Sequence, residues 1–131
     1  MHAARLREIP LFSGLSDRQR EQVARWADEV DIKAGKHLVD QGRFAYEFFV
    51  IEEGTAEVTH DGDHLTDLGP GDFFGEIGIL GDEPRTATVV AISDMTLIVM
   101  TDRDFREMTR SMPDVAETIR RTMETRMKRS D

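Results

Sequence analysis

The residues best suited to chemistry are Glu76 and Arg85, which lie in the segment FFGEIGILGDEPRTATV at residues 73–89. Arg85 is the sole Lys or Arg in residues 44–102, and the sequence around it is strongly acidic. A lone arginine in such surroundings needs an anionic partner, which is either a carboxylate of the protein or a bound phosphate. Gly75 would let the backbone approach a ligand closely, and a short helix after it would direct N–H groups at an anion. Glu76 would repel a phosphate alone, so its presence indicates a ligand that also carries hydroxyl groups, such as a ribose.

This segment resembles the phosphate-binding cassette of the cyclic nucleotide-binding domain family. The family pattern is an apolar or aromatic residue, Gly-Glu and a short apolar turn, followed after a spacer by Arg, a small residue and Ala. The corresponding residues here are Phe74-Gly75-Glu76-Ile77-Gly78-Ile79-Leu80 and Pro84-Arg85-Thr86-Ala87-Thr88-Val89.

The resemblance implies specific roles for these residues. Glu76 would bond the ribose 2′-hydroxyl, Arg85 would bond the cyclic phosphate, and backbone N–H groups near Gly78 and Thr86 would add to the phosphate contacts. The implied ligand-binding residues are Gly75, Glu76, Ile77, Gly78, Arg85, Thr86 and Ala87. The alternative is a ligand-free relative of the same fold, which would bind proteins or dimerise and would hold an internal Glu76–Arg85 salt bridge.

Composition fits one ordinary globular domain. The chain has 131 residues, of which 39% are hydrophobic and 33% are charged, and it has no cysteine and no apolar run long enough to span a bilayer. A reducing, cytoplasmic location is therefore expected. Residues 28–83 carry 15 acidic and 3 basic side chains, which would repel nucleic acid and acidic membrane surfaces. The cations Arg126, Lys128 and Arg129 near the C-terminus are expected to be a solvated helix end.

The pattern of the chain predicts three parts of a single domain spanning 1–131. Residues 1–28 are predicted to form helices on either side of a bend at residues 9–12, with Ser16 as the N-cap of the helix over residues 17–28. The stretch IPLFSGLSDRQREQVARWADEV resembles the helical lead-in of the family. Residues 29–101 alternate short strands with Gly-containing turns, and the eight predicted strands are 30–33, 37–40, 47–52, 56–60, 64–68, 72–74, 87–92 and 95–101. This spacing predicts a mainly β fold, an eight-stranded jelly-roll barrel with flanking helices.

Residues 102–131 return to helix, with a break before Pro113. An apolar stripe recurs every three or four residues at Phe105, Met108, Met112, Val115, Ile119, Met123 and Met127. Its first half, through Val115, is expected to pack in the core. Its second half is expected either to pack in the same way or to act as a mobile lid and homodimer seam, because methionines adapt to surfaces that repack. Predicted walls of a base pocket are Val58, Thr66, Leu68, Met123 and Met127.

No other group of residues indicates chemistry. His60 and His64 flank the turn at Asp61-Gly62, but their spacing does not match a jelly-roll metal site, so exposed hairpin polarity and no metal are expected. No nucleophile with a partnered His and no Walker motif is present, so the chain is not expected to be an enzyme. No DNA-binding motif follows the last helix, so direct DNA binding is not expected either.

The sequence thus predicts a stand-alone sensor of a cyclic nucleotide that moves its C-terminal helices on binding and acts on an effector protein not identified by the sequence. Cyclic AMP is the leading ligand. Thr86, directly after the arginine, occurs in relatives that prefer cyclic GMP and in relatives that prefer cyclic AMP, so both nucleotides remain open.

Overall fold

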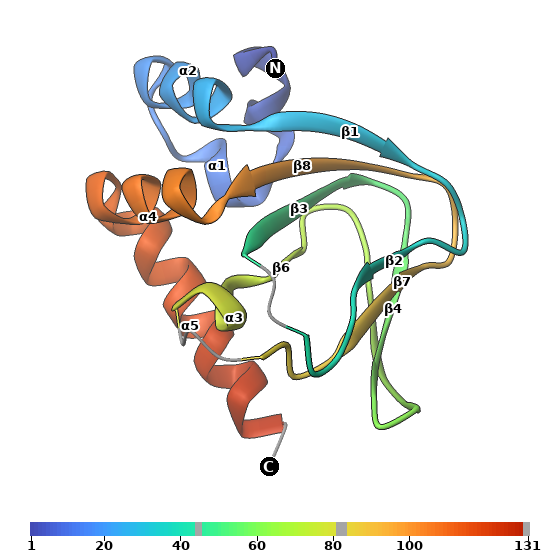
Figure 1. The fold of residues 1–131 in the computed structure, drawn as a ribbon. Helices are drawn as coiled ribbons and strands as arrows, with labels where there is room; N and C mark the ends of the chain where they lie inside the picture. Colours follow the sequence, from blue (N-terminus) through green and yellow to red (C-terminus); the bar gives the residue numbers. More distant parts are fainter. Residues whose placement is uncertain (44–45, 81–83, 130–131) are drawn as a thin grey trace.

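The computed structural model describes residues 1–43, 46–80 and 84–129, and residues 81–83 of the predicted cassette lie outside this description (Figure 1). The chain begins with three short helical elements, η1 (Ala3–Glu8), α1 (Pro10–Ser13) and α2 (Asp17–Trp26). The predicted N-cap is confirmed: the Ser16 hydroxyl accepts a bond from Gln19 N at 3.1 Å, and the Gln19 side chain accepts one from Ser16 N at 2.9 Å. The bend predicted at residues 9–12 is instead one turn of helix, because Pro10 stands at its first position.

Eight strands within the described residues form two antiparallel sheets of four (Figure 1). The first sheet has the order β1 (Asp28–Ile32), β8 (Met95–Thr101), β3 (Glu47–Glu53) and β6 (Phe73–Phe74). The second has the order β2 (His37–Val39), β7 (Thr88–Ala91), β4 (Ala56–His60) and β5 (Asp63–Leu68). The predicted fold class is confirmed, and each predicted strand has a counterpart, because Gly-containing turns and β-branched runs mark strands well in this chain. The first strand begins at Asp28, two residues earlier than predicted, so the helix predicted over residues 17–28 ends at Trp26 instead.

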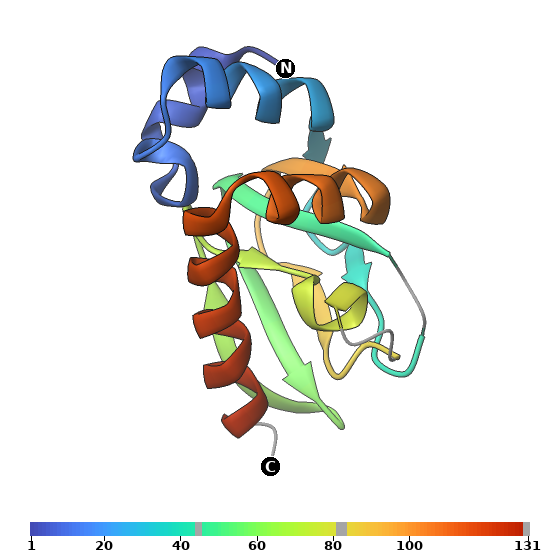
Figure 2. The same cartoon turned by 90° about the vertical axis from the view of Figure 1, so that its left-hand side faces the viewer.

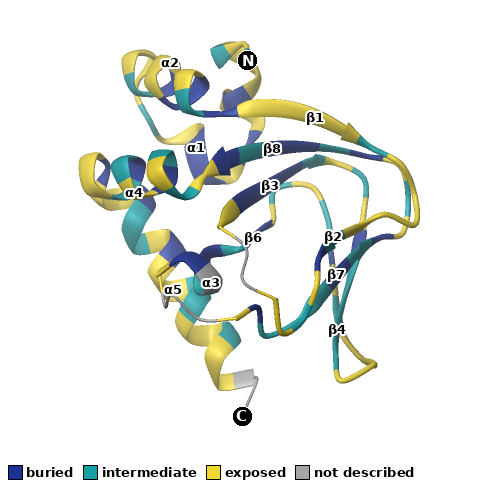
Figure 3. Ribbon diagram, viewed as in Figure 1, coloured by how far each residue is buried: buried dark blue, intermediate teal, exposed yellow. Residues whose placement is uncertain are grey.

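The first sheet has apolar side chains on both faces. Along β3, Phe49 and Ile51 pack against residues of the second sheet, whereas Phe48 and Val50 pack against the helices. Successive residues of a strand point to opposite faces, so one buried strand contributes to two cores. The edge strand β1 is largely exposed (Figure 3).

Three further helices complete the fold, α3 (Glu76–Leu80), α4 (Asp102–Ser111) and α5 (Pro113–Arg129). The side chain of Thr101 caps α4 by accepting a hydrogen bond from Asp104 N. The apolar stripe is buried from Phe105 through Ile119, Met123 is half-buried, and Met127 is 50% exposed. The short helix α3 contacts α5 (Figures 1 and 2), and Ile79 of α3 is fully buried among the stripe residues. None of the helices in the described part of the chain is long and apolar enough to cross a membrane.

Candidate functional site

The site begins at Gly75, the link between β6 and α3. Its φ of +100° lies in the region that only glycine adopts easily. A Cβ at this position would collide with the carbonyl oxygen of Glu47 and would lie 3.1 Å from Nη1 of Arg85. The close approach of β3 and Arg85 to this link therefore requires glycine.

Arg85 is buried at the base of the site, with 4% of its surface exposed. Its Nη1 donates to the carbonyl oxygen of Gly75 at 2.6 Å, and its Nη2 donates to that of Glu47 at 2.8 Å. Backbone bonds of 2.8 Å with Gly42 and Arg43 fix the arginine from the other side. Burial lowers the pKa of Arg85, while the carboxylates of Glu76 and Glu47 act in the opposite direction. Arginine stays protonated under such conditions, so the site contains a buried cation.

Glu76 begins α3 and is almost fully buried, with 1% of its surface exposed. Its Oε1 lies 2.6 Å from Nη1 of Arg126, which reaches the site from α5. Arg126 also donates to the carbonyl oxygen of Phe73 and lies 5.3 Å from the centre of that ring. The alternative prediction of a Glu76–Arg85 salt bridge is therefore wrong for the described residues, because Arg126 supplies the cation that Glu76 requires. The expectation that Arg126 is a solvated helix end is corrected by the same contact, since its side chain is only 16% exposed.

Two buried polar atoms of the site have no hydrogen-bond partner within the described residues: the acceptor Glu76 Oε2 and the donor Arg85 Nε. An unmatched buried donor or acceptor costs free energy, and native proteins rarely leave one without a reason. A ligand that offers both an anionic oxygen and a hydroxyl group would satisfy both atoms.

These side chains lie at a pocket between the second sheet and the α3 segment. Six of the seven predicted ligand-binding residues line it, and for Gly78 only its place in α3 is described. Of the predicted base-pocket walls, Val58, Thr66 and Leu68 line the pocket, whereas Met123 and Met127 do not. The lining residues that were not predicted to contact the ligand are Val39, Leu65, Phe74, Val89 and Arg126.

Arg126 is the residue that sequence reasoning missed. One signal was available: Arg126 falls between Met123 and Met127, on the helix whose stripe was expected to cover the ligand. A long basic side chain there can reach past the stripe while its methylene groups pack on apolar surface. Charge counting alone could not separate it from Lys128 and the other cations of the helix end.

Comparison with known proteins gives consistent matches. The family model "Cyclic nucleotide-binding domain" matches residues 29–112. A cyclic nucleotide-gated potassium channel of Rhizobium etli is 34% identical over 114 residues, which are 87% of this chain and 32% of the channel. The chain spans about a third of the length of the curated relatives it matches.

Two solved structures share the fold. The structure described as cAMP-bound PfPKA-R has a TM-score of 0.88 at 22% identity, covering 98% of this chain and 45% of that one. The regulatory subunit of a cAMP-independent protein kinase A from Trypanosoma brucei has a TM-score of 0.82 at 24% identity, covering 92% of this chain and 44% of that one. At these identities the likeness is one of fold.

Proposed function

This chain belongs to the cyclic nucleotide-binding domain family, and we propose that it is a sensor module that binds a cyclic nucleotide, with cAMP as the leading candidate. Fold alone does not decide this, because one structure with this fold is described as cAMP-bound and another as the regulatory subunit of a cAMP-independent kinase. The decision rests on the chemistry of the pocket.

The observation that carries the proposal is the pair of unmatched buried atoms, Glu76 Oε2 and Arg85 Nε, in residues that line one pocket. In the proposed complex the cyclic phosphate accepts charge-assisted hydrogen bonds from Arg85, and a ribose hydroxyl donates to Oε2 of Glu76. Free inorganic phosphate would place its negative charge beside the carboxylate of Glu76, which would repel it. A phosphorylated sugar matches both groups.

The base would lie against the apolar side of the pocket. Val58, Thr66 and Leu68 come from β4 and β5, and Leu65 adds a partly exposed apolar side chain at the rim. Apolar walls with few polar groups bind a flat heterocycle with modest selectivity between purines. The preference for cAMP over cGMP is accordingly part of the proposal, and Thr86 is the residue at which the two ligands would differ.

Glu76 would connect the ligand to the last helix. Its two carboxylate oxygens have different partners in this arrangement, because Oε1 is held by Arg126 of α5 and Oε2 is free for the ribose. A nucleotide that fixes Glu76 would therefore fix Arg126 and favour the docked position of α5. Arg106 of α4 donates to the carbonyl oxygen of Ile79 at 2.7 Å, so α3 is tied to both C-terminal helices. Movement of these helices is the proposed output toward an effector protein, and a homodimer formed through α5 is a further part of the proposal.

Calorimetric titration tests the binding. Protein stripped of ligand by unfolding and refolding is titrated separately with cAMP and cGMP, beside Arg85→Ala and Arg85→Lys. Loss of a buried charge-assisted contact is expected to weaken binding at least about 100-fold in Arg85→Ala. Arg85→Lys keeps the charge but loses the planar fork, so its binding should also be weak.

Arg103→Ala is the matched control, because Arg103 is exposed on α4 and does not line the pocket. It should bind as the wild type does. Folded, stripped wild-type protein that gives no heat with either nucleotide, or an Arg85→Ala protein that binds tightly, would overturn the proposal. The ligand-free interaction module would then be the better explanation.

A further inference from the structure

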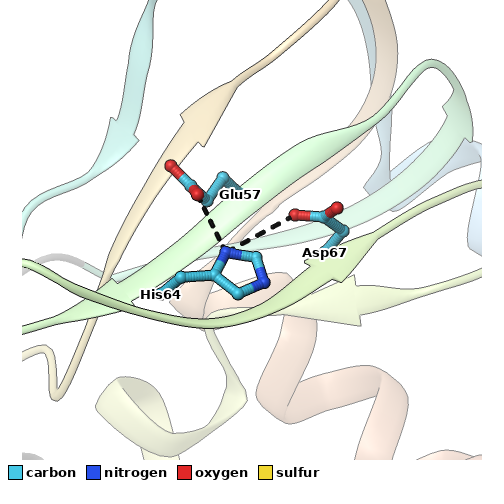
Figure 4. Close-up of side chains that lie close together, drawn as sticks. All are labelled: Glu57, His64 and Asp67. Carbon is cyan, nitrogen blue, oxygen red and sulfur yellow. Dashed lines mark hydrogen bonds and ion pairs between the residues drawn. The ribbon is translucent and has the colours of Figure 1, made fainter.

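A second polar cluster lies on the β4–β5 hairpin, on the face opposite to the pocket. It consists of Glu57 on β4 and His64 and Asp67 on β5, and the three side chains point toward one another (Figure 4). Val58 and Thr66, which alternate with members of this cluster along their strands, line the pocket on the other face.

A register shift in the hairpin creates the cluster. Val58 pairs with Thr66, but the next residue of β4, Thr59, pairs with His64, so that Leu65 is the extra residue of a bulge. In an unshifted ladder, His64 would have paired with His60 and would have pointed to the opposite face. The bulge therefore turns His64 toward Glu57, which is a common use of bulges near functional sites.

The cluster places two carboxylates side by side. Glu57 and Asp67 are directly opposite each other across the two strands, and like charges in that position destabilise a sheet. The ion pairs that they form within the described residues are both with His64. The sequence places no Lys or Arg in residues 44–84, so the hairpin has no permanent cation of its own.

The distances suit a metal ion. Nδ1 of His64 lies 2.8 Å from Oε2 of Glu57 and 3.9 Å from Oδ1 of Asp67, and one ligand atom from each of the three residues lies within 4.8 Å of the others. A tetrahedral ion with bonds of about 2.1 Å separates its ligand atoms by about 3.4 Å. The observed distances to Nδ1 bracket that value, so small rotations of exposed side chains would bring all three atoms to bonding distance.

We propose that Glu57, His64 and Asp67 bind a divalent transition-metal ion of the Zn²⁺ type. The imidazole selects such ions over Mg²⁺ and Ca²⁺, which prefer oxygen ligands, and water would complete the coordination. This revises the expectation of no metal, which was based on His60 and His64 together. The structure separates those two residues, because Nδ1 of His60 bonds the carbonyl oxygen of Thr86 at 2.7 Å. The bound ion would hold the register of the hairpin that lines the pocket.

Titration of untagged protein with Zn²⁺ in a buffer free of chelators and phosphate tests the proposal. We expect one ion per chain, bound in the micromolar range, and weaker binding in His64→Ala and in Asp67→Asn. Each variant should lose at least about 10- to 100-fold in affinity for Zn²⁺, which is the loss typically caused by removing a residue that only hydrogen-bonds to a metal ligand. His64, Glu57 and Asp67 are exposed or half-buried, so these variants should keep the fold, which circular dichroism checks.

His37→Ala is the matched control. His37 Nδ1 lies 2.8 Å from Oδ1 of Asp40, the same distance as in the His64–Glu57 pair, and its side chain is similarly exposed. It belongs to no three-ligand cluster within the described residues. Zinc binding should be unchanged in this variant. Wild-type binding no tighter than that of His64→Ala, or equal binding by Asp67→Asn, would overturn the proposal, and so would a preference for Ca²⁺ over Zn²⁺.

Discussion

Glu76 and Arg126 form a buried ion pair that joins the candidate site to the last helix, with Oε1 and Nη1 separated by 2.6 Å. The carboxylate is 1% exposed and the arginine side chain is 16% exposed. Taking two charges out of water is costly, and the pair offsets that cost only while both partners stay in place. The position of α5 and the charge state of the site are therefore linked.

Replacing Arg126 should destabilise the protein and weaken nucleotide binding together. Arg126→Ala leaves Glu76 buried without its partner, which costs up to about 3–5 kcal/mol of unfolding free energy. Chemical denaturation and calorimetric titration measure the two effects. The control is Arg120→Ala on the same helix, whose partners Glu117 and Glu124 are 42% and 53% exposed, so water screens these ion pairs and their loss should change the stability little. Equal stability of the two variants would contradict the proposed link.

Gly75→Ala should destabilise the fold and weaken nucleotide binding. The new Cβ would collide with the carbonyl oxygen of Glu47 and press on Arg85, in addition to the strain of a positive φ. Gly35→Ala is a matched control, because Gly35 has a φ of +90° but nothing within 4 Å of an added Cβ.

Backbone strain of this kind costs about 1–3 kcal/mol in both variants. The collision adds a further loss in Gly75→Ala alone. Denaturation of the two proteins under identical conditions separates strain from collision. If both variants lost the same stability and bound nucleotide equally well, the close approach of Glu47 and Arg85 to Gly75 would not matter to the site.

The sequence predicted the fold well because local rules decide most of it. Gly-containing turns separate the strands, Ser16 caps its helix as expected, and regularly spaced apolar residues mark the buried faces. The helical turn at Pro10 was missed because a one-turn helix has too few residues to show a period.

The site was predicted only in part, for a physical reason. Glu76 and Arg85 fall in one short segment, so their spacing is visible in the sequence. Arg126 reaches Glu76 from a distant helix, and its direction depends on how α5 packs against α3 and β6. The same limit applies to His64, because its partners were decided by a bulge that no turn signal in the sequence indicates. Contacts set by packing and register need the structure.

Stability should fall as the pH rises through the range from 4.5 to 7. Burial, and then the neighbouring Glu29, raise the pKa of Glu52 from 4.5 to about 7. In that range the folded protein holds a proton that the unfolded chain has released. The contribution of protonated Glu52 to the free energy of unfolding is therefore complete below pH 4.5 and is lost as the pH rises through 7. The pKa of Glu29 is lowered, chiefly by the hydrogen bond from Glu52. Glu29 therefore changes the stability only at pH values below 4.5, outside the range in which Glu52 acts.

Glu52→Gln mimics the protonated carboxyl and should remove this pH dependence. At pH 8 the variant should be more stable than the wild type, by about 1–3 kcal/mol. Glu53→Gln is the control, because Glu53 is the exposed neighbour at the end of β3 and its charge makes the smallest of the contributions that raise the pKa of Glu52. Its variant should therefore keep most of the wild-type slope. Thermal unfolding between pH 4 and 8 measures all three proteins. A Glu52→Gln protein with the wild-type slope would assign the dependence to other groups.

Arg106 should transmit the state of the site to α4 without touching the ligand. Its Nη2 donates to the carbonyl oxygen of Ile79 at 2.7 Å, near the end of α3, and it does not line the pocket. Since Ile79 is fully buried among the residues of α4 and α5, the bond ties the short helix to the elements proposed to move. Arg106→Ala is expected to weaken nucleotide binding by an amount typical of coupling residues, about 0.5–2 kcal/mol.

Hydrogen exchange of α3 and α4, with and without cAMP, separates this role from simple packing. In the wild type the nucleotide should protect both helices, whereas in Arg106→Ala it should protect α3 but have less effect on α4, because the bond between them is gone. Arg110→Ala is the control on the same helix, since Arg110 is exposed and its ion pair with Glu107 spans 3.4 Å. Protection of α4 that persists unchanged in Arg106→Ala would mean that the signal passes through Arg126 and α5 alone.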